Sequence, residues 1–193
     1  YISSDAVYAD SDAPLTETSP TAPGSLHGVM HLARELMLES VVSAPLAILR
    51  PSLIYGAADP HNGYGPNQYR RLAAAGEPIA LFGKGEERRD HVLIDDVAEI
   101  VRRVLFNRSR GVLNVATGAV TPFHEIADLV LANFDGGAGI EYKARSGPMP
   151  HNGYRPFATD ACRVAFPDFE YTPIADGIAK AHRDMTEIDN GRS

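Results

Sequence analysis

The sequence predicts an α/β protein built around a parallel sheet. A short strand at residues 1–4, a helix at 25–40 and a nearly continuous apolar strand at 47–53 form one strand-helix-strand unit. With 44% apolar and 22% charged residues, a chain of 193 residues can bury the core of one ordinary domain, or parts of two. We therefore do not expect the chain as a whole to be disordered.

The helix at residues 25–40 is predicted to be amphipathic. Its apolar residues recur every three or four positions, so one stripe should face a core. This stripe consists of Leu26, Val29, Met30, Ala33, Leu36 and Met37. Arg34, Glu35 and Glu39 should face water. His27 and His31 are four residues apart and share one face of the helix.

Strands and helices continue to alternate after a loop at residues 56–66. Glycine and proline positions, apolar periodicity and end charges indicate where each element begins and ends. The predicted elements are a helix at 67–75, a strand at 78–82, a turn at 83–85, a strand at 90–94, a helix at 95–107, a strand at 111–116, a helix from Thr121 and Pro122 to about Phe134, a strand at 140–144, and helices at 160–166 and 174–185.

Composition limits the partners and the compartment. A net charge of -7, with 18 dispersed Lys and Arg residues, argues against a nucleic-acid partner. No segment approaches the roughly 20 apolar residues of a membrane span. The single cysteine, Cys162, allows no internal disulfide and is expected to be a small buried residue. We expect a cytoplasmic protein, and the start inside a strand without methionine suggests the C-terminal part of a longer chain.

The histidine pair has two interpretations from spacing alone. Histidines four apart on a helix can share a zinc ion, but such a site needs a third ligand, and the sequence places none of His61, His91, His124 and His151 nearby. A pair without a fixed third ligand is more often a solvated polar pair, so no metal site is predicted.

The sequence also lacks a phosphate-cradling glycine loop. No Gly-x-Gly-x-x-Gly follows a predicted strand, and Gly136-Gly137-Ala138-Gly139 follows a helix, which is typical of a linker. These residues therefore offer no site for the pyrophosphate of a dinucleotide.

Five blocks of sequence carry a resemblance to a known family. In chain order they are Ser3-Ser4-Asp5-Ala6-Val7-Tyr8, Arg50-Pro51 with Tyr55-Gly56, Gly83-Lys84-Gly85 leading to Arg89-Asp90-His91-Val92 and Asp95-Asp96-Val97-Ala98, Asn114-Val115-Ala116, and Arg155 with Asp160. Their order resembles that of the extended short-chain dehydrogenase/reductase family, the NAD-dependent epimerases and dehydratases.

The resemblance implies an architecture. The chain would form the C-terminal part of a Rossmann-like doubly wound parallel sheet with a small α/β substrate-binding lobe. Residues 1–56 would belong to the NAD-binding domain and 57–193 mainly to the substrate-binding lobe, with 90–118 returning to the Rossmann-like sheet.

The resemblance also implies catalytic residues. Ser4 matches the hydroxyl residue that hydrogen-bonds the reacting sugar oxygen, and Asp5 resembles the acid of the sugar dehydratases, although Ala6 stands where those enzymes have glutamate. His27 occupies the position of the family's tyrosine and His31 that of its lysine. A histidine can exchange protons near neutral pH. A neutral imidazole at position 31, however, would depress a neighbour's pKa less than lysine does.

Further residues are assigned to the cofactor and the substrate in the same way. His31, Pro51 and Ser52 would lie beside NAD or NADP. Arg89, Arg155 and Leu53 would contact a nucleotide-sugar substrate, the arginines gripping its diphosphate. Several epimerases have asparagine where this chain has Leu53. Taken alone, Arg89 fits equally well a surface ion pair with Asp90 or Glu87.

Two functions are expected from this set. The first is an NAD(P)-dependent epimerase, dehydratase or reductase acting on a nucleotide sugar through Ser4 and His27. The second is a nucleotide- or partner-binding protein on the same scaffold that has lost catalysis. The resemblance also implies a homodimer formed through the helix that contains His27.

Overall fold

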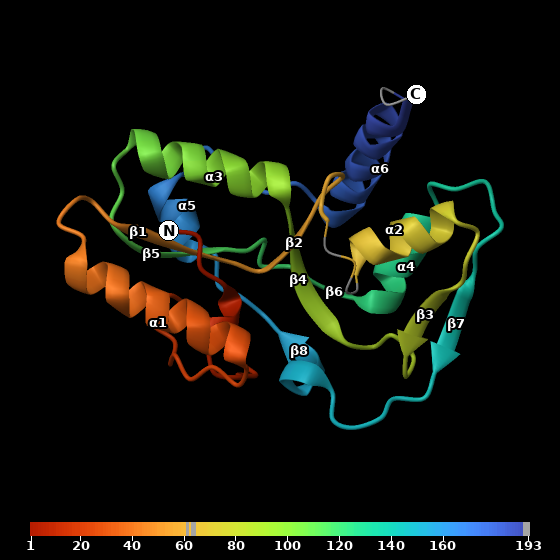
Figure 1. Cartoon of the computed structure of the whole chain (residues 1–193), viewed down its shortest axis with the longest axis horizontal. Coiled ribbons are helices and arrows are strands. Elements are labelled where there is room, and N and C mark those ends of the chain that lie inside the picture. The colour runs from red at the N-terminus through yellow and green to blue at the C-terminus, as the bar shows by residue number, and fades with distance from the viewer. Residues whose placement is uncertain (61, 63–64, 191–193) are drawn as a thin grey trace.

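A computed structural model describes residues 1–60, 62 and 65–190 of the chain. Its elements form two lobes joined in the middle of the molecule (Figure 1). The helices and strands are α1 (Leu26–Val41), β1 (Ala47–Pro51), β2 (Leu53–Tyr55), α2 (Pro66–Ala74), β3 (Ile79–Phe82), β4 (Arg88–Leu93), α3 (Ile94–Phe106), β5 (Gly111–Val115), β6 (Val120–Pro122), α4 (Phe123–Leu131), β7 (Ile140–Lys143), β8 (Tyr154–Arg155), α5 (Asp160–Ala165) and α6 (Ile174–Asn190). Two 3-10 turns, η1 (Asp5–Val7) and η2 (Pro150–Gly153), complete them.

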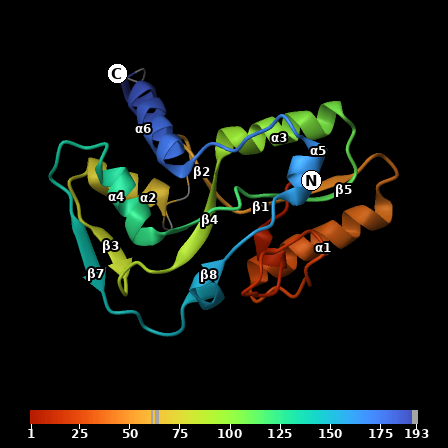
Figure 2. The ribbon, with the colours of Figure 1, turned by 180° about the vertical axis from the view of Figure 1, so that it is seen from behind.

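The first lobe is a parallel sheet between helices. β1 pairs in parallel with β5, and the first residues of the chain lie along the other side of β1. Ser3 N donates to Leu49 O at 2.7 Å, and Leu49 N donates to Tyr1 O at 2.9 Å. Both ribbon views show α1 below this sheet and α3 above it (Figures 1 and 2). The parallel pairing confirms the predicted α/β class.

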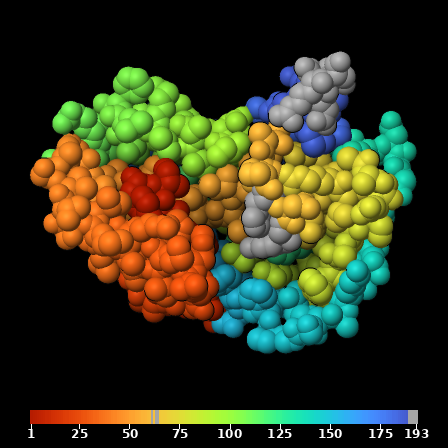
Figure 3. Space-filling view, viewed as in Figure 1, coloured from red at the N-terminus to blue at the C-terminus, as the bar shows by residue number. Residues whose placement is uncertain are grey.

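The second lobe contains a four-stranded sheet and a two-stranded sheet. β2 and β4 pair in parallel, with β6 antiparallel and β8 parallel to β4, and β3 pairs in parallel with β7. An apolar core lies between these strands and α2, α4 and α6. In the space-filling view the red and orange N-terminal lobe meets this yellow-to-cyan lobe along a broad front (Figure 3). The assignment of 1–56 and 57–193 to separate functional domains stays a prediction.

The single strand predicted at residues 47–53 is wrong, because the chain changes sheets at Ser52. β1 pairs with β5 and β2 pairs with β4. Ser52 N donates to Val115 O, and its hydroxyl donates to Asp90 Oδ1 at 2.6 Å. The same carboxylate also accepts from the backbone N–H groups of Thr117 and Gly118. One buried acid therefore fixes the crossing between the lobes.

The helix predicted from Thr121 to about Phe134 begins and ends elsewhere. Thr121 and Pro122 belong to β6, which pairs with β4, and α4 runs only over Phe123–Leu131. Proline disfavours a helical conformation in the residue before it. Pro122 itself is extended, with φ -63° and ψ 145°.

The orientation predicted for α1 is also wrong. The stripe of Leu26, Val29, Met30, Ala33, Leu36 and Met37 is exposed, with Leu26 at 76%. Only Gly28 and Glu35 are buried in this helix, and Glu35, predicted to face water, is 2% exposed. The spacing of apolar residues identified the apolar face of the helix correctly. It could not show whether that face packs against the sheet or faces solvent.

Glu35 is buried because a strand supplies its partner. Arg50 on β1 donates from Nε to Oε1 at 3.0 Å and from Nη2 to Oε2 at 2.6 Å, a bidentate pair. The hydroxyl of Ser3 also donates to Oε1. The Arg50 guanidinium lies 4.8 Å from the centre of the Tyr8 ring. This pair attaches α1 to the sheet where apolar contacts would otherwise be expected.

Breaking the pair should destabilise the fold strongly. Glu35→Gln keeps the side chain's size but leaves the Arg50 charge buried without a counter-charge, so we expect a loss of about 3–5 kcal/mol in the free energy of unfolding. The matched control is Glu39→Gln, an exposed position on the same helix, with an expected change below about 0.5 kcal/mol. Urea unfolding measures both, and equal small losses would contradict this account of α1.

The exposed stripe of α1 predicts self-association. Ile2, on the first segment of the sheet, is also 42% exposed, so an apolar surface and a strand edge are both uncovered. We expect the 193-residue chain to form concentration-dependent oligomers by light scattering, and Leu36→Glu with Met37→Glu to shift them toward monomer. A cooperative, strongly stable monomer at all concentrations would overturn this expectation.

Candidate active site

A cavity of about 440 Å³, the first cavity, lies where η1, the start of α1, the Ser52 crossing and η2 meet. Every residue predicted for the site except Arg155 lines it. The lining residues are Ser3, Ser4, Asp5, Ala6, Ser25, His27, His31, Pro51, Ser52, Leu53, Ile54, Arg89 and His151. The fold thus brings together residues from five separate stretches of the sequence: 3–6, 25–31, 51–54, 89 and 151.

Local structure explains why His27 lies beside Ser4. Ser25 caps α1 by accepting from Gly28 N at 3.1 Å, and Ser4 caps η1 by accepting from Ala6 N at 3.2 Å. Gly28 permits the close approach of the two caps, because a Cβ atom there would lie 2.1 Å from Ala6 O. A larger residue at position 28 would push the helix and His27 away from Ser4.

The two histidines are stacked edge to face. Their ring centroids are 4.6 Å apart, and Nδ1 of His31 lies 3.0 Å from the Tyr1 hydroxyl. Burial lowers the pKa of His31, and the charges of His27 and Arg34 lower it further. His31 is therefore neutral at pH 7 and does not reproduce the positive charge of a lysine.

Of the other histidines considered for a metal site, His151 lines the same cavity as the pair, whereas His91 and His124 do not. His91 is buried, with burial and the Arg89 charge lowering its pKa to about 3, and His124 lies 3.2 Å from Gly85 O through Nδ1. His61 lies outside the described residues. Within the part of the chain that the structure describes, no group of three metal-ligating side chains is found.

Arg155 lies behind the first cavity rather than on its wall. It is 1% exposed, and it donates from Nε to Asp5 Oδ2 at 2.7 Å and from Nη2 to Asp5 O at 2.6 Å. Its Nη1 is 3.2 Å from Asp10 Oδ1. These contacts fix Asp5 and join the first residues of the chain to β8.

Arg89 is buried between the two lobes. Its Nη2 lies 4.0 Å from Asp5 Oδ2, and its Nη1 lies 3.4 Å from Glu87 Oε1. Neither contact is a surface ion pair, and Asp90 is occupied by Ser52, Thr117 and Gly118 instead. The Arg89 guanidinium forms part of the wall of the first cavity, and the carboxylates of Asp5 and Glu87 balance part of its positive charge.

A second cavity of about 710 Å³ begins where the first ends. Arg89 and His151 line both cavities. The second cavity is lined by Gln68, Tyr69, Ala80, Leu81, Phe82, Gly85, Glu87, Arg89, Phe123, Lys143, Arg145, Ser146, Pro148, Pro150 and His151. Its size is in the range of small-molecule sites, and it combines basic and aromatic side chains.

The sequence reasoning missed the basic residues of this second cavity. Arg145 lies 3.7 Å from Glu87 Oε2 through Nη1, and its Nε is buried without a partner among the described residues. Lys143 is exposed on the same wall. The available signal was the pair of basic residues at the end of the predicted strand at 140–144, opposite the Gly83-Lys84-Gly85 turn.

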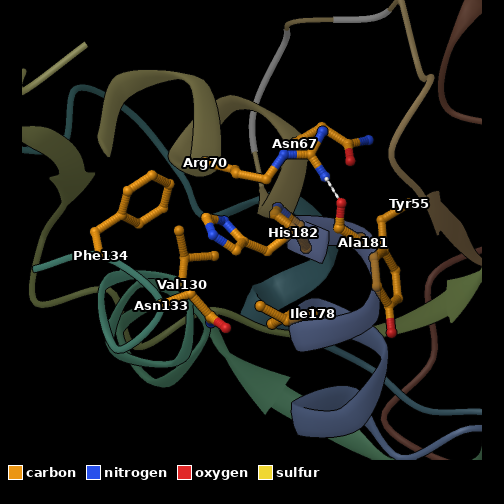
Figure 4. A pocket seen from close by; sticks show the side chains of 10 residues that line it. Tyr55, Asn67, Arg70, Val130, Asn133, Phe134, Ile178, Ala181 and His182 are labelled. Atoms are coloured by element: carbon orange, nitrogen blue, oxygen red, sulfur yellow. Dashed lines mark hydrogen bonds between the residues drawn. The ribbon is translucent and has the colours of Figure 1, made fainter. Parts of the chain in front are cut away.

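A third cavity is structural. It lies between α2, α4 and α6 and measures about 10 Å³, enough for one water molecule (Figure 4). Arg70 donates from Nη1 to Ala181 O at 3.1 Å across it. This contact ties α2 to the C-terminal helix.

Comparisons with known proteins give one matching family and several solved structures with a similar fold. The model of the NAD dependent epimerase/dehydratase family matches residues 1–116. A UDP-N-acetylglucosamine 4-epimerase from Methanobrevibacter ruminantium, solved with UDP-N-acetylmuramic acid, is similar at 18% identity and a TM-score of 0.84, over 97% of this chain and 62% of that one.

Two further solved structures show the same fold. A UDP-glucuronic acid 4-epimerase from Bacillus cereus, with UDP-glucuronic acid and NAD, is 18% identical with a TM-score of 0.83, over 97% of this chain and 60% of that one. A dTDP-glucose 4,6-dehydratase from Bacillus anthracis with NAD is 17% identical with a TM-score of 0.80, over 98% and 61%. The chain thus spans about three-fifths of the length of these structures.

The histidine pair predicts a measurable titration. We expect NMR to give His31 a pKa below 6.5, because burial and neighbouring positive charge disfavour its protonated form. His27→Asn removes one such charge and should raise the pKa of His31. A pKa of His31 at or above 6.5 in the unsubstituted protein would contradict a neutral His31 at pH 7.

Proposed function

The chain belongs to the NAD dependent epimerase/dehydratase family, and we propose that its two joined cavities bind a nucleotide sugar for NAD(P)-dependent epimerase or dehydratase chemistry. The observation that carries the proposal is that Arg89 and His151 line both cavities. The first contains hydroxyl, carboxylate and imidazole groups, and the second contains basic and aromatic groups. Together they match a sugar followed by an anionic nucleotide.

The second cavity suits the nucleotide half. Tyr69 and Phe123 provide aromatic surface, with ring centroids 6.3 Å apart. Arg89, Lys143 and Arg145 provide positive charge against phosphate oxygens. In the proposal Arg145 adds a second guanidinium to the wall of this cavity, while Arg155 supports the site from behind through Asp5.

The first cavity suits the reacting sugar. The Ser4 hydroxyl oxygen accepts from Ala6 N at 3.2 Å, and its own proton is donated to Asp5 Oδ1 over a long 3.5 Å, so that proton can turn to a bound sugar oxygen. We assign His27 the transfer of a proton to or from that sugar oxygen, since imidazole exchanges protons near neutral pH. Asp5, held by Arg155, positions this end of η1 and supplies the carboxylate of the catalytic set. Leu53 contributes an apolar wall.

The proposed cofactor is NAD or NADP, which when bound would accept and return a hydride. His31, Pro51 and Ser52 line the first cavity and are the residues of this chain that would lie beside its nicotinamide end. Their backbone groups and the neutral His31 imidazole place no positive charge beside the nicotinamide ring, which is cationic in its oxidised form. The Ser52 hydroxyl is already donated to Asp90, so it holds the wall in place.

One observation favours the second candidate function, a nucleotide- or partner-binding protein that has lost catalysis. His31 is neutral and lies beside the Tyr1 hydroxyl, so it does not supply the charge that a lysine would give to a neighbouring acid. The exposed stripe of α1 would then serve a partner or a second copy of the chain. In the described residues no helix has the length and apolar content to cross a membrane.

Turnover by the full-length protein separates the two functions. With UDP-glucose and NAD as probes, we expect His27→Asn to lower turnover by about 100-fold or more while UDP affinity stays unchanged, because a proton-transfer group contributes on that scale. Leu26→Asn, beside it but outside both cavities, is the matched control and should have little effect.

The double variant His27→Tyr with His31→Lys tests the same question by introducing the family's tyrosine and lysine. The proposal predicts lower turnover, since the surroundings of the pair are built for imidazoles. Higher turnover would show a degraded family site and favour the binding protein. Absence of any nucleotide binding by the unsubstituted protein would reject the enzyme and the nucleotide-binding form of the second function, and would leave only a partner-binding protein.

A further inference from the structure

Arg89 and His151 are the residues that the two cavities share. A ligand that extends from one cavity into the other must therefore pass between a guanidinium and an imidazole. Arg89 comes from β4 and His151 from η2, so the passage is formed by two elements far apart in the sequence. A group that contacts both side chains at once would be compact and anionic.

The backbone and the hydrogen bonds of η2 hold His151 in place. His151 and Asn152 have φ values of 50° and 52°, in the left-handed region that non-glycine residues rarely adopt. Nδ1 of His151 lies 2.5 Å from Asp10 Oδ1, and Nη1 of Arg155 lies 3.0 Å from the same nitrogen. The left-handed turn therefore holds the His151 ring next to the Asp10 carboxylate.

The contact with Asp10 also determines the tautomer. An ionised carboxylate only accepts hydrogen bonds, so a separation of 2.5 Å requires a proton on Nδ1. Arg155 can only donate, so its Nη1 then bonds Asp10 Oδ1 at 3.2 Å rather than the ring, and it supports His151 through Asp10. Nε2 is then the nitrogen left for a ligand, and it has no partner among the described residues. The His151 side chain is 29% exposed, which keeps that edge of the ring accessible.

We propose that His151, supported by Asp10 and Arg155, is the second ligand of the substrate's diphosphate beside Arg89, and that diphosphate binding takes up a proton at Nε2. The proposal rests on the proposed function, since it names the group that holds the middle of the nucleotide sugar. It gives Arg155 the role of a positioning residue, whereas the sequence suggested direct contact with the substrate.

The charges around His151 determine the sign of the effect. Burial lowers its pKa, and so do the charges of Arg89 and Arg155, while Asp10 opposes them. Asp5 lies behind both arginines and balances part of their charge. The ring is neutral at pH 7 in the free protein. A diphosphate brought to Nε2 would raise the pKa, so affinity should rise as pH falls, until pH drops below the pKa of the free protein.

Calorimetric titration with inorganic pyrophosphate and with UDP tests the proposal on the 193-residue chain. Titrations between about pH 5.5 and 8, in buffers of different ionisation enthalpy, should show proton uptake and up to a tenfold gain in affinity per pH unit, the limit for one proton. His151→Asn should remove the part of the proton uptake and of the pH dependence that exceeds the ionisation of the probe's own terminal phosphate, whose pKa is about 6. His124→Asn, outside both cavities, is the matched control and should keep both.

If His151→Asn fails to fold, NMR of the His151 ring in the unsubstituted chain provides a second test. Saturating UDP should raise the pKa of His151 in the unsubstituted chain. An unchanged pKa, or a variant His151→Asn that keeps the full pH dependence, would overturn the proposal while leaving the proposed function intact. If the unsubstituted chain binds neither probe at any pH, the proposed function fails first and this proposal falls with it.

Discussion

The Asp5 carboxylate, buried between Arg155 and Arg89, holds the two lobes and the site together. It joins η1, at the start of the chain, to residues of β8 and β4. Acidic and basic side chains alternate along the passage in the order Asp10, Arg155, Asp5, Arg89, Glu87 and Arg145. Each buried charge needs its neighbours, because an unpaired charge away from water is costly. The alternation therefore fixes the geometry of both cavities and leaves Arg89 partly balanced yet able to meet an anion.

The pairing of buried charges also explains how α1 is placed and why its histidines reach the site. Glu35 and Arg50 attach the helix to the sheet through a charge pair, and Gly28 lets it approach η1 closely. Its apolar stripe is then free to face outward, and its first turn places His27 and His31 on the wall of the first cavity. His31 is neutral, so this site lacks the positive charge that a lysine at the same position would supply. The chemistry proposed here consequently relies on imidazole and hydroxyl groups.

Local sequence patterns predicted most elements but not their long-range partners. Periodicity and end signals located α1, α3, β3, β4, β5 and β7 to within a few residues, and the ordered blocks identified the family. They missed the sheet change at Ser52 and the burial of Glu35, because both depend on residues that lie elsewhere in the chain. For the site, the sequence assembled one wall of the first cavity but assigned Arg155 to the substrate. Its partner Asp5 lies at the opposite end of the chain, and His151 and Arg145 gave no motif that sequence spacing could detect. The roles of the site residues stay predictions.

The central claim is that the two cavities form one ligand site divided at Arg89 and His151. A crystal structure of the chain with bound UDP-glucose tests it most directly. The account predicts the uracil end in the second cavity, the glucose in the first beside Ser4 and His27, and the diphosphate between Arg89 and His151. A diphosphate in contact with neither side chain, or a ligand confined to one cavity with its phosphates in solvent, would contradict it.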